Sequence, residues 1–262
     1  MSLLLENKVI VIIGGTSGLG LSAAQAFARE GAKLVLLGRD DEHLHAARHA
    51  LSHEHVILPG DAATPEAAPA AIEEARTVFG AFDCLYHVAG GSGRRMGDGP
   101  LHEIMDEGWH YTIALNQTSV FYSNRAAIAA LLDQQRGGAI LNMTSVLAYA
   151  PAPAHFASHA YAAAKAAVIG MTRSAAAYYA PHKIRINALA PGCTDTPMAG
   201  RVRENAAVQD YLRRKQPLDG GRIGLPGDAD GAAVLLLSDA ASFITGQVLA
   251  VDGGWSVTDA GV

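Results

Sequence analysis

The sequence predicts an α/β protein: a single doubly wound domain with a seven-stranded, mostly parallel sheet and helices on both faces. Short apolar runs alternate with longer helical segments along all 262 residues, and such alternation gives parallel strands joined by right-handed crossovers. Hydrophobic residues make up 50% of the chain and charged residues 17%, which supplies a large core and excludes intrinsic disorder. No linker or repeat interrupts the pattern, so we expect residues 1–262 to form one domain.

The seven expected strands are short apolar runs bounded by turn-forming residues. They cover residues 9–13, 33–37, 56–58, 84–88, 139–143, 184–190 and 248–251. The first run is continuously apolar and is closed by Gly14 and Gly15, which is typical of a strand buried on both faces. The expected helices lie between the strands, over residues 19–30, 41–51, 65–79, 115–135, 161–180 and 226–237. Residues 91–100 and 191–221 are loop-like and follow strand ends, where ligands bind in open α/β sheets.

Composition excludes several classes of function. The net charge of −5 and the pI near 6.1 leave no electrostatic footprint for nucleic acid. The apolar runs fall far short of a bilayer crossing, so we expect no membrane partner. Cys84 and Cys193 belong to no disulfide framework or paired metal motif, and a reduced cytoplasmic compartment is expected. The eleven histidines lack the Cys, Asp or Glu pattern of a tetrahedral site, so we expect no metal.

The loop after the first strand predicts a dinucleotide-binding site. It reads Gly14-Gly15-Thr16-Ser17-Gly18-Leu19-Gly20 and lies between an expected strand and an expected helix. Gly14 permits a sharp exit from the strand, Gly18 lets the backbone approach a phosphate, and Gly20 allows close packing of helix on strand. The pyrophosphate would rest on the helix N-terminus, where free N–H groups and the helix dipole attract anions. A lone motif of this kind is often an ordinary glycine-rich turn, but its position favours the binding site.

Tyr161 and Lys165 form a second candidate site. They lie one turn apart on the same face of an expected helix. A positive charge held nearby lowers the pKa of a phenol from about 10, which suits it to proton transfer near neutral pH. Such pairs also arise by chance on solvated helices, but here the three intervening residues are alanines and the surroundings are apolar. The pair therefore indicates acid–base chemistry.

In their order along the chain, these motifs resemble those of the short-chain dehydrogenase/reductase family, in its single-domain subgroup with a Tyr-x-x-x-Lys pair. The resemblance covers the whole chain. Beyond the two motifs above, the matching positions are Asp61, Ala62, Ala89, Gly90, Asn116, Ser145, Pro191, Gly192, Thr194, Thr196 and the segment Val251-Asp252-Gly253-Gly254. The chain departs from the family at Ile13, where threonine is usual, and at His87 and Val88, where two asparagines are usual.

The resemblance implies a Rossmann-fold oxidoreductase that transfers a hydride between a nicotinamide cofactor and a small carbonyl or secondary alcohol. Tyr161 would exchange a proton with the substrate oxygen, and Lys165 would lower the pKa of Tyr161 and hold the nicotinamide ribose. Ser145 would hydrogen-bond the substrate oxygen, and Asn116 would position a water that links Lys165 to solvent. Cofactor contacts are implied for Gly14, Thr16, Ser17, Gly18, Leu19, Gly20, Arg39, Asp61, Ala62, Ala89, Gly90, Tyr161, Lys165, Pro191, Gly192, Thr194 and Thr196.

The resemblance also implies a homotetramer and a mobile substrate loop over about residues 192–221. The segment between Ser145 and Tyr161 is longer than is usual in the family, and a short insertion between strand and helix explains this most simply. Ser158 is nearer to Tyr161 in the sequence, but it belongs to no strand end. Ser145 therefore remains the expected serine.

Two observations compete over which nicotinamide cofactor the chain prefers. An acid about 20 residues after the glycines binds the ribose 2′-hydroxyl of NAD, and Asp40 lies at that distance from Gly20. Gly38, however, holds the strand-end position where that acid is usual, and the guanidinium of Arg39 beside it suits a 2′-phosphate. Arg39 could instead stack on adenine or point to solvent. We predict NADP(H), with an NAD-dependent secondary alcohol dehydrogenase as the alternative and a non-catalytic dinucleotide-sensing module as a third interpretation.

Overall fold

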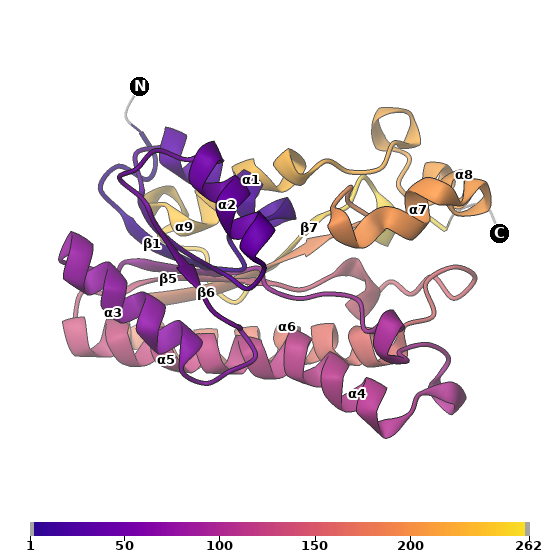
Figure 1. Ribbon diagram of the computed structural model, residues 1–262, viewed down its shortest axis with the longest axis horizontal. Coiled ribbons are helices and arrows are strands. Elements are labelled where there is room, and N and C mark those ends of the chain that lie inside the picture. Colours follow the sequence, from indigo (N-terminus) through magenta and orange to yellow (C-terminus); the bar gives the residue numbers. More distant parts are fainter. Residues whose placement is uncertain (1–2, 260–262) are drawn as a thin grey trace.

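One parallel sheet of seven strands runs through the computed structural model, which describes residues 3–259 (Figure 1). Its strands are β1 (Val9–Ile13), β2 (Lys33–Gly38), β3 (Val56–Pro59), β4 (Cys84–His87), β5 (Gly138–Met143), β6 (Ile184–Pro191) and β7 (Val248–Val251). Their order across the sheet is β3-β2-β1-β4-β5-β6-β7, and every pairing is parallel. The expected doubly wound α/β class is confirmed. Residues 1–2 and 260–262 of the expected domain lie outside the described residues.

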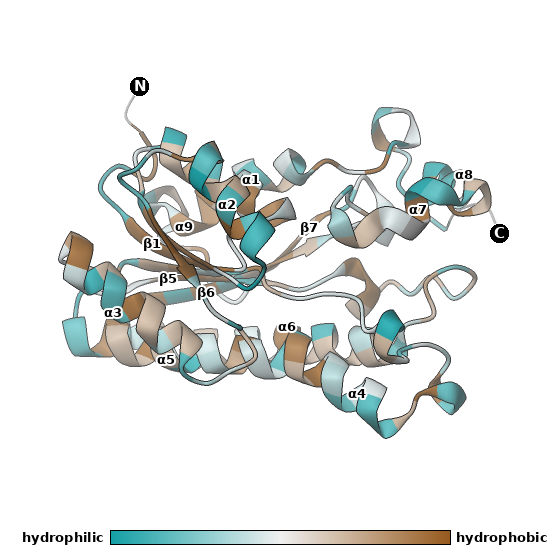
Figure 2. Cartoon of the chain, viewed as in Figure 1, coloured by the Kyte–Doolittle hydropathy of each residue, from teal (hydrophilic) through white to brown (hydrophobic). Residues whose placement is uncertain are grey.

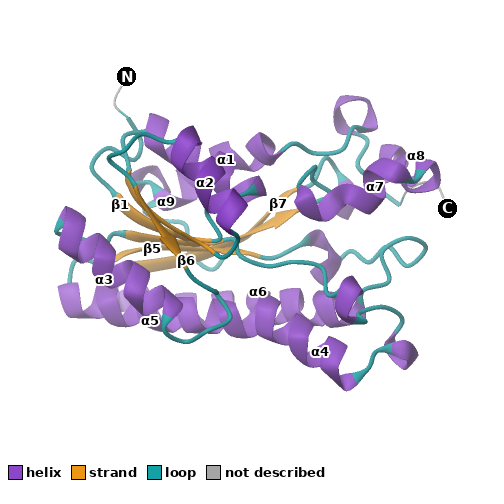
Figure 3. Ribbon diagram, in the orientation of Figure 1, coloured by secondary structure: helices purple, strands orange, loops and turns teal. Residues whose placement is uncertain are grey.

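Helices cover both faces of the sheet, as Figures 1 and 3 show. One face carries α1 (Gly18–Arg29), α2 (Asp41–Ala50) and α9 (Asp230–Leu237). The opposite face carries α3 (Ala67–Phe79), α4 (Asp106–Ile113), α5 (Ser119–Gln134) and α6 (His159–Tyr179). Two short helices, α7 (Gly200–Glu204) and α8 (Ala206–Lys215), stand beyond the strand ends, within the segment expected to be the substrate loop.

The expected strands differ from the observed ones by at most one residue at either end, but three expected helix starts are off by two residues or more. The helix expected from Tyr161 begins at His159, and the one expected from Pro226 opens as a 3-10 turn over Pro226–Ala229 before α9. The helix expected over residues 115–135 begins at Asp106, because α4, a π-helical turn over Ala114–Thr118 and α5 follow one another without a break. Gly108 lies inside this helix because the chain packs closely there: a Cβ atom would lie 2.4 Å from the carbonyl oxygen of Met96. The helix expected from Pro65 begins only at Ala67.

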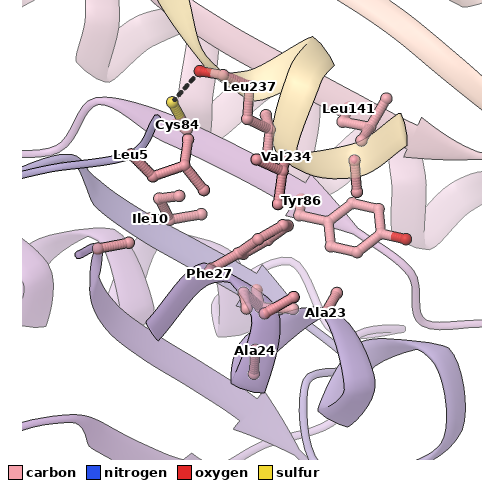
Figure 4. Packing of buried hydrophobic residues seen from close by; sticks show 14 of the residues in the cluster. Leu5, Ile10, Ala23, Ala24, Phe27, Cys84, Tyr86, Leu141, Val234 and Leu237 are labelled. Carbon is pink, nitrogen blue, oxygen red and sulfur yellow. Dashed lines mark hydrogen bonds between the residues drawn. The ribbon is translucent and has the colours of Figure 1, made fainter. Parts of the chain in front are cut away.

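The core lies on both sides of the sheet, between the strands and the covering helices. Figure 2 shows the hydrophobic residues gathered in the strands and the hydrophilic ones on the outer sides of the helices. In the layer under α1 and α9, Ile10, Phe27 and Tyr86 are each 0% exposed (Figure 4). The thiol of Cys84 lies in the same layer and donates a hydrogen bond to the carbonyl of Leu237 at 3.6 Å. The apolar runs of the sequence are therefore buried because helices cover both faces of each central strand.

Parallel pairing brings the C-terminal ends of all seven strands to one edge of the sheet. The chain fills one half of the sheet outward from β1 and then starts the other half at β4, so the strand order reverses between β1 and β4. Ligands of open α/β sheets bind in the crevice at such a reversal. This edge therefore positions the candidate site.

Truncation of Leu141 tests this account of the core. Leu141 in β5 is 0% exposed, so Leu141→Ala should lower the free energy of unfolding by about 2–5 kcal/mol. Leu101→Ala is the matched control, because Leu101 is 67% exposed and its truncation should change that free energy by less than about 0.5 kcal/mol. Chemical denaturation measures both; equal losses would contradict the burial described above.

Candidate active site

The glycine loop leaves the C-terminal end of β1 and leads directly into α1. Gly14 and Gly18 adopt positive φ angles of 88° and 49°, a region that favours glycine. At Gly20 a Cβ atom would lie 2.0 Å from the carbonyl oxygen of Gly14, so only glycine fits there. Ser17 at the N-cap makes no side-chain hydrogen bond to the helix, and the first turn of α1 carries no acid. The N-terminus of α1 therefore keeps the positive end of its dipole for an anion.

A cavity of about 330 Å³ lies between this loop and the neighbouring strand ends. The expected cofactor residues that line it are Gly14, Thr16, Ser17, Gly18, Leu19, Gly20, Arg39, Asp61, Ala62, Ala89, Gly90 and Thr196. Sequence reasoning missed the lining residues Leu37, His43, Gly60, Val88, Leu115, Pro197 and Met198, because only the assembled strand ends bring them together. Bare glycine backbone, a helix N-terminus and a guanidinium fit the pyrophosphate and ribose of a nicotinamide dinucleotide.

Five expected cofactor residues lie outside this cavity: Tyr161 and Lys165 on α6, described below, and three residues at the end of β6. Pro191, Gly192 and Thr194 come at and after the end of β6 and line a second cavity of about 240 Å³. The N–H of Gly192 donates to the carbonyl of Val251 at 3.1 Å, which fixes the turn that leaves β6. A contact between these three residues and a cofactor stays a prediction.

The strand end at Gly38 has no room for an acidic side chain. A Cβ atom on Gly38 would lie 2.1 Å from Oγ1 of Thr16, whose side chain is buried. The carboxylate of Asp40 accepts hydrogen bonds from the N–H groups of Glu42 at 3.1 Å and His43 at 3.3 Å, so it caps α2. The next residue after Gly38, Arg39, is mostly exposed, and its guanidinium lies 3.6 Å from the carboxylate of Asp61.

The second group of expected residues gathers where β5 ends and α6 begins. The Nζ atom of Lys165 is buried, donates to the carbonyl of Met143 at 2.9 Å, and lies 5.6 Å from the centre of the Tyr161 ring. Ser145 lies two residues after the end of β5 and is 7% exposed. Its hydroxyl is hydrogen-bonded to the phenol of Tyr161 and also accepts from the N–H of Leu147 at 3.2 Å.

Asn116 joins this group from the π-helical turn between α4 and α5. Its amide nitrogen donates to the carbonyls of Gly91 and Thr112, each at 2.9 Å, and its oxygen accepts from the N–H of Gly91 at 3.0 Å. A Cβ atom on Gly90 would lie 2.9 Å from the Asn116 oxygen and 3.2 Å from Nζ of Lys165. Asn116 and Lys165 therefore flank Gly90 closely, and glycine is the residue that leaves them room.

Burial determines the protonation of Tyr161 and Lys165. Burial raises the pKa of the Tyr161 phenol to about 12, although the hydrogen bond with Ser145 acts in the opposite direction. The expectation that this pKa falls below its ordinary value is thus wrong for the protein alone, because desolvation of the phenolate dominates. Burial lowers the pKa of the Lys165 ammonium to about 8. At neutral pH the phenol holds its proton and Lys165 is charged.

His87, at a position where the family usually has asparagine, is fully buried beneath the site. Its Nδ1 lies 2.7 Å from the hydroxyl of Ser123 and its Nε2 lies 3.2 Å from the carbonyl of Ala89. Burial, and then the charge of Lys165, lowers the pKa of His87 to about 3. The neutral imidazole therefore ties the end of β4 to α5 and has a structural role.

The expected insertion before α6 packs against α8 and the C-terminal segment. The ring of Phe156 meets that of Trp255 edge to face, with centroids 5.3 Å apart, and the rings of His155 and Tyr211 lie 5.0 Å apart. The indole N–H of Trp255 donates to the carbonyl of Ala150 at 3.0 Å. These aromatic contacts connect three segments that are remote in sequence.

Sequence reasoning also missed Asp98, which lies in the loop between β4 and α4. Its side chain is buried, and its carboxylate accepts hydrogen bonds from N–H groups in the first turn of α6. In the sequence Asp98 and Gly99 form an ordinary Asp-Gly pair within a glycine-rich loop. No local pattern indicates a partner about sixty residues away.

Comparison with known proteins decides the family. A family model described as enoyl-(acyl carrier protein) reductase matches residues 14–256. A 2,5-dichloro-2,5-cyclohexadiene-1,4-diol dehydrogenase from Sphingobium indicum is 35% identical over 253 residues, which cover 96% of this chain and 98% of the relative. The chain belongs to the short-chain dehydrogenase/reductase family.

Further relatives match this short-chain dehydrogenase/reductase over nearly its whole length. A 2-(S)-hydroxypropyl-CoM dehydrogenase from Xanthobacter autotrophicus is 35% identical, covering 97% of this chain and 98% of the relative. The solved structure of levodione reductase superposes with a TM-score of 0.86 at 28% identity, covering 96% of this chain and 98% of that one. A short-chain type dehydrogenase/reductase from Mycobacterium ulcerans gives 0.87 at 28% identity, covering 97% and 91%. The protein is therefore an oxidoreductase of the class acting on CH–OH or C=O groups with a nicotinamide dinucleotide.

The histidine-rich helix α2 lies beside the cofactor cavity. The rings of His45 and His49 lie tilted against each other on its exposed side, with centroids 4.5 Å apart. Within residues 3–259, no group of three or more His, Cys, Asp or Glu side chains is arranged to hold a metal ion.

In the same part of the chain, no helix has the length and apolar character needed to cross a membrane.

The burial of Lys165 predicts a specific pH dependence of stability. Below pH 8 the Lys165 ammonium is charged in both the folded and the unfolded protein. Between about pH 8 and 10.5 the folded protein loses this proton while the unfolded chain keeps it. The free energy of unfolding therefore rises with pH in this window. Lys165→Met removes this contribution. The free energy of unfolding of the wild type minus that of Lys165→Met should therefore rise by about 3 kcal/mol between pH 7 and pH 10, as measured by denaturant titrations. Lys33→Met, an exposed lysine, should give parallel curves; parallel curves for Lys165→Met would contradict the burial.

Proposed function

We propose that the chain is an NADP(H)-dependent carbonyl reductase or alcohol dehydrogenase acting on a small or medium neutral substrate. The observation that carries this proposal is the protonated phenol of Tyr161, hydrogen-bonded to Ser145 and lying over the buried ammonium of Lys165. Asn116 completes this group, and the glycine-loop cavity lies beside it, sharing Gly90 with it. A proton donor next to a dinucleotide cavity is the arrangement that carbonyl reduction requires.

The cofactor would extend along the edge of the sheet from β2 to β6. The N-terminus of α1 would hold its pyrophosphate, Asp61 and Ala62 its adenine, and Lys165 its nicotinamide ribose. The remaining contacts would come from the backbone at Ala89, Gly90, Pro191, Gly192, Thr194 and Thr196. When bound, the nicotinamide supplies or accepts the hydride.

Proton transfer falls to Tyr161. In the reductive direction the phenol donates its proton to the carbonyl oxygen as charge develops there, and the Ser145 hydroxyl donates a hydrogen bond to the same oxygen. The phenolate left behind is stabilised by the Lys165 ammonium. With a pKa of about 8, Lys165 exchanges protons readily near neutral pH. Asn116, across Gly90 from Lys165, would position the water that returns a proton from solvent.

The preference for NADP(H) rests on the strand end at β2. Thr16 fills the space that an acidic side chain on Gly38 would need, and Asp40 is engaged in capping α2. Gly38 therefore offers no carboxylate to a ribose 2′-hydroxyl, and Asp40, which also lines the cavity, uses Oδ1 for the cap. Arg39 lines the cavity next to them with a guanidinium that suits a 2′-phosphate.

The substrate side would be formed by the insertion before α6 and by the loop over about residues 192–221, which contains α7 and α8. The relatives named for a cyclohexadiene diol and for hydroxypropyl-CoM act on secondary alcohols of small molecules, which supports a substrate of that class. A single domain over residues 1–262, a homotetramer and a cytoplasmic location stay predictions. A non-catalytic dinucleotide-sensing module is the alternative from a different class. A panel of carbonyls and alcohols, followed by nicotinamide absorbance with both cofactors and in both directions, discriminates the two.

Tyr161→Phe tests the proposed proton donor. Loss of the hydroxyl should lower kcat by about 10²–10⁴-fold in that panel, because it removes the proposed proton donor. Binding of NADPH, measured by fluorescence titration, should stay unchanged. Tyr178→Phe is the matched control, since Tyr178 is 73% exposed on the same helix and its variant should keep full activity. Full turnover by Tyr161→Phe would refute the mechanism.

Arg39→Ala tests the cofactor preference. Removing the guanidinium should raise the dissociation constant for NADPH by about 10- to 100-fold, as expected for charge-assisted hydrogen bonds. The dissociation constant for NADH should not change. Arg48→Ala on α2 serves as a control for the loss of one positive charge nearby. Equal affinity of the wild type for NADH and NADPH would contradict the preference, and tighter binding of NADH would favour the NAD-dependent alternative.

A further inference from the structure

The first turn of α6 depends on an acceptor from outside its own segment. The N–H groups at the start of a helix have no partner within the helix, and a side chain at the N-cap commonly accepts from them. Ser158 holds the N-cap position of α6, but its backbone angles are φ −140° and ψ 79° and its side chain makes no capping hydrogen bond. Tyr161 lies in this first turn, and Lys165 follows one turn later.

Asp98 supplies the missing acceptors from the loop between β4 and α4. Its Oδ1 accepts from the N–H of Ala160 and its Oδ2 from the N–H of Tyr161, both at 3.0 Å. Asp98 is 4% exposed, and its backbone N–H donates to the carbonyl of Gly93 at 3.1 Å. Both oxygens are thus used on the N-terminal turn of one helix, where the helix dipole favours a negative charge.

Two further contacts join the same loop to the start of α6. The guanidinium of Arg94 donates to the carbonyl of Ala157 at 2.8 Å. The carbonyl of Gly99 lies 3.0 Å from Nδ1 of His159 and also accepts from its backbone N–H at 3.3 Å. The loop therefore fixes the turn that precedes Tyr161 as well as Tyr161 itself.

We propose that Asp98 is a positioning residue for proton transfer: it holds the backbone of Tyr161 so that the phenol meets Ser145 and the substrate oxygen. One turn further along α6, the hydrogen bond from Lys165 to Met143 fixes the helix against the end of β5. Asp98 fixes the preceding turn, so the Tyr161 ring is held between two anchors. This inference rests on the proposed function, since it assigns Asp98 a role only if Tyr161 transfers the proton.

Asp98→Asn and Asp98→Ala test the proposal against Asp106→Ala, which removes an exposed acid from the first turn of α4. Asparagine keeps the size and one acceptor; alanine keeps neither. Misplacing a reacting group by about 1 Å can cost 10²-fold in rate, so kcat should fall by about 10- to 100-fold in the alanine variant and by less in the asparagine variant. The KM for substrate and the affinity for NADPH should change little.

The isotope effect, read together with kcat, separates positioning from a merely structural cap, and hydrogen–deuterium exchange reports whether the cap is lost. The primary deuterium isotope effect with 4-deuterated NADPH should rise in both Asp98 variants, because the chemical step becomes slower than product release. Hydrogen–deuterium exchange should increase in peptides covering residues 158–165, and Asp106→Ala should change neither readout. Faster exchange with wild-type kcat and isotope effect would reduce Asp98 to a structural cap and overturn the proposal. If Asp98→Ala does not fold, the same outcomes are read from Asp98→Asn.

Activity measurements on the wild type and on the Tyr161 and Asp98 variants distinguish failure of the two proposals. A wild type that transfers no hydride across the panel refutes the proposed function, and the positioning role with it, whatever the exchange data show. A wild type that turns over and loses activity in Tyr161→Phe, but not in Asp98→Asn or Asp98→Ala, refutes only the role of Asp98.

Discussion

A buried positive charge at the end of β5 constrains the rest of the site. The ammonium of Lys165 donates to the carbonyl of Met143, and burial lowers its pKa to about 8. Because a buried charge is costly, its neighbours must accommodate it. Gly90 carries no side chain where a Cβ atom would lie 3.2 Å from the ammonium. His87 beneath it is held neutral, and the carbonyl of Lys165 itself accepts from the hydroxyl of Thr144 at 2.7 Å.

The parallel sheet places the Lys165 ammonium near the glycine loop. Strand ends at β1, β4 and β5 lie side by side only because the sheet reverses its order between β1 and β4. The reversal places the glycine loop and the Lys165 ammonium along one edge, on either side of Gly90. Helix α6 spans from this edge across the sheet, and Asp98 holds its first turn. Hydride and proton chemistry would thus meet at one edge of the sheet.

Patterns local in the sequence predicted much of this. Apolar runs gave each strand to within one residue, because strands buried on both faces need continuous apolar sequence. The glycine loop and the Tyr161–Lys165 pair were predictable because each lies within a few residues. Asp98 was not, since its partners lie on a distant helix, and neither was the raised pKa of Tyr161, because desolvation depends on the assembled surroundings. The helix start at Asp106 was missed because Gly108 is accommodated by packing against Met96.

The most direct measurement of the central constraint is the titration of Lys165 itself. The chain has only five lysines, so the Cε resonances of protein labelled with ¹³C-lysine can be followed by NMR, with Lys165→Met assigning the signal. The burial of the ammonium predicts a titration near pH 8 for Lys165 in the protein without cofactor. A Lys165 signal that titrates at the ordinary value of about 10.4 would show a solvated ammonium and contradict the account.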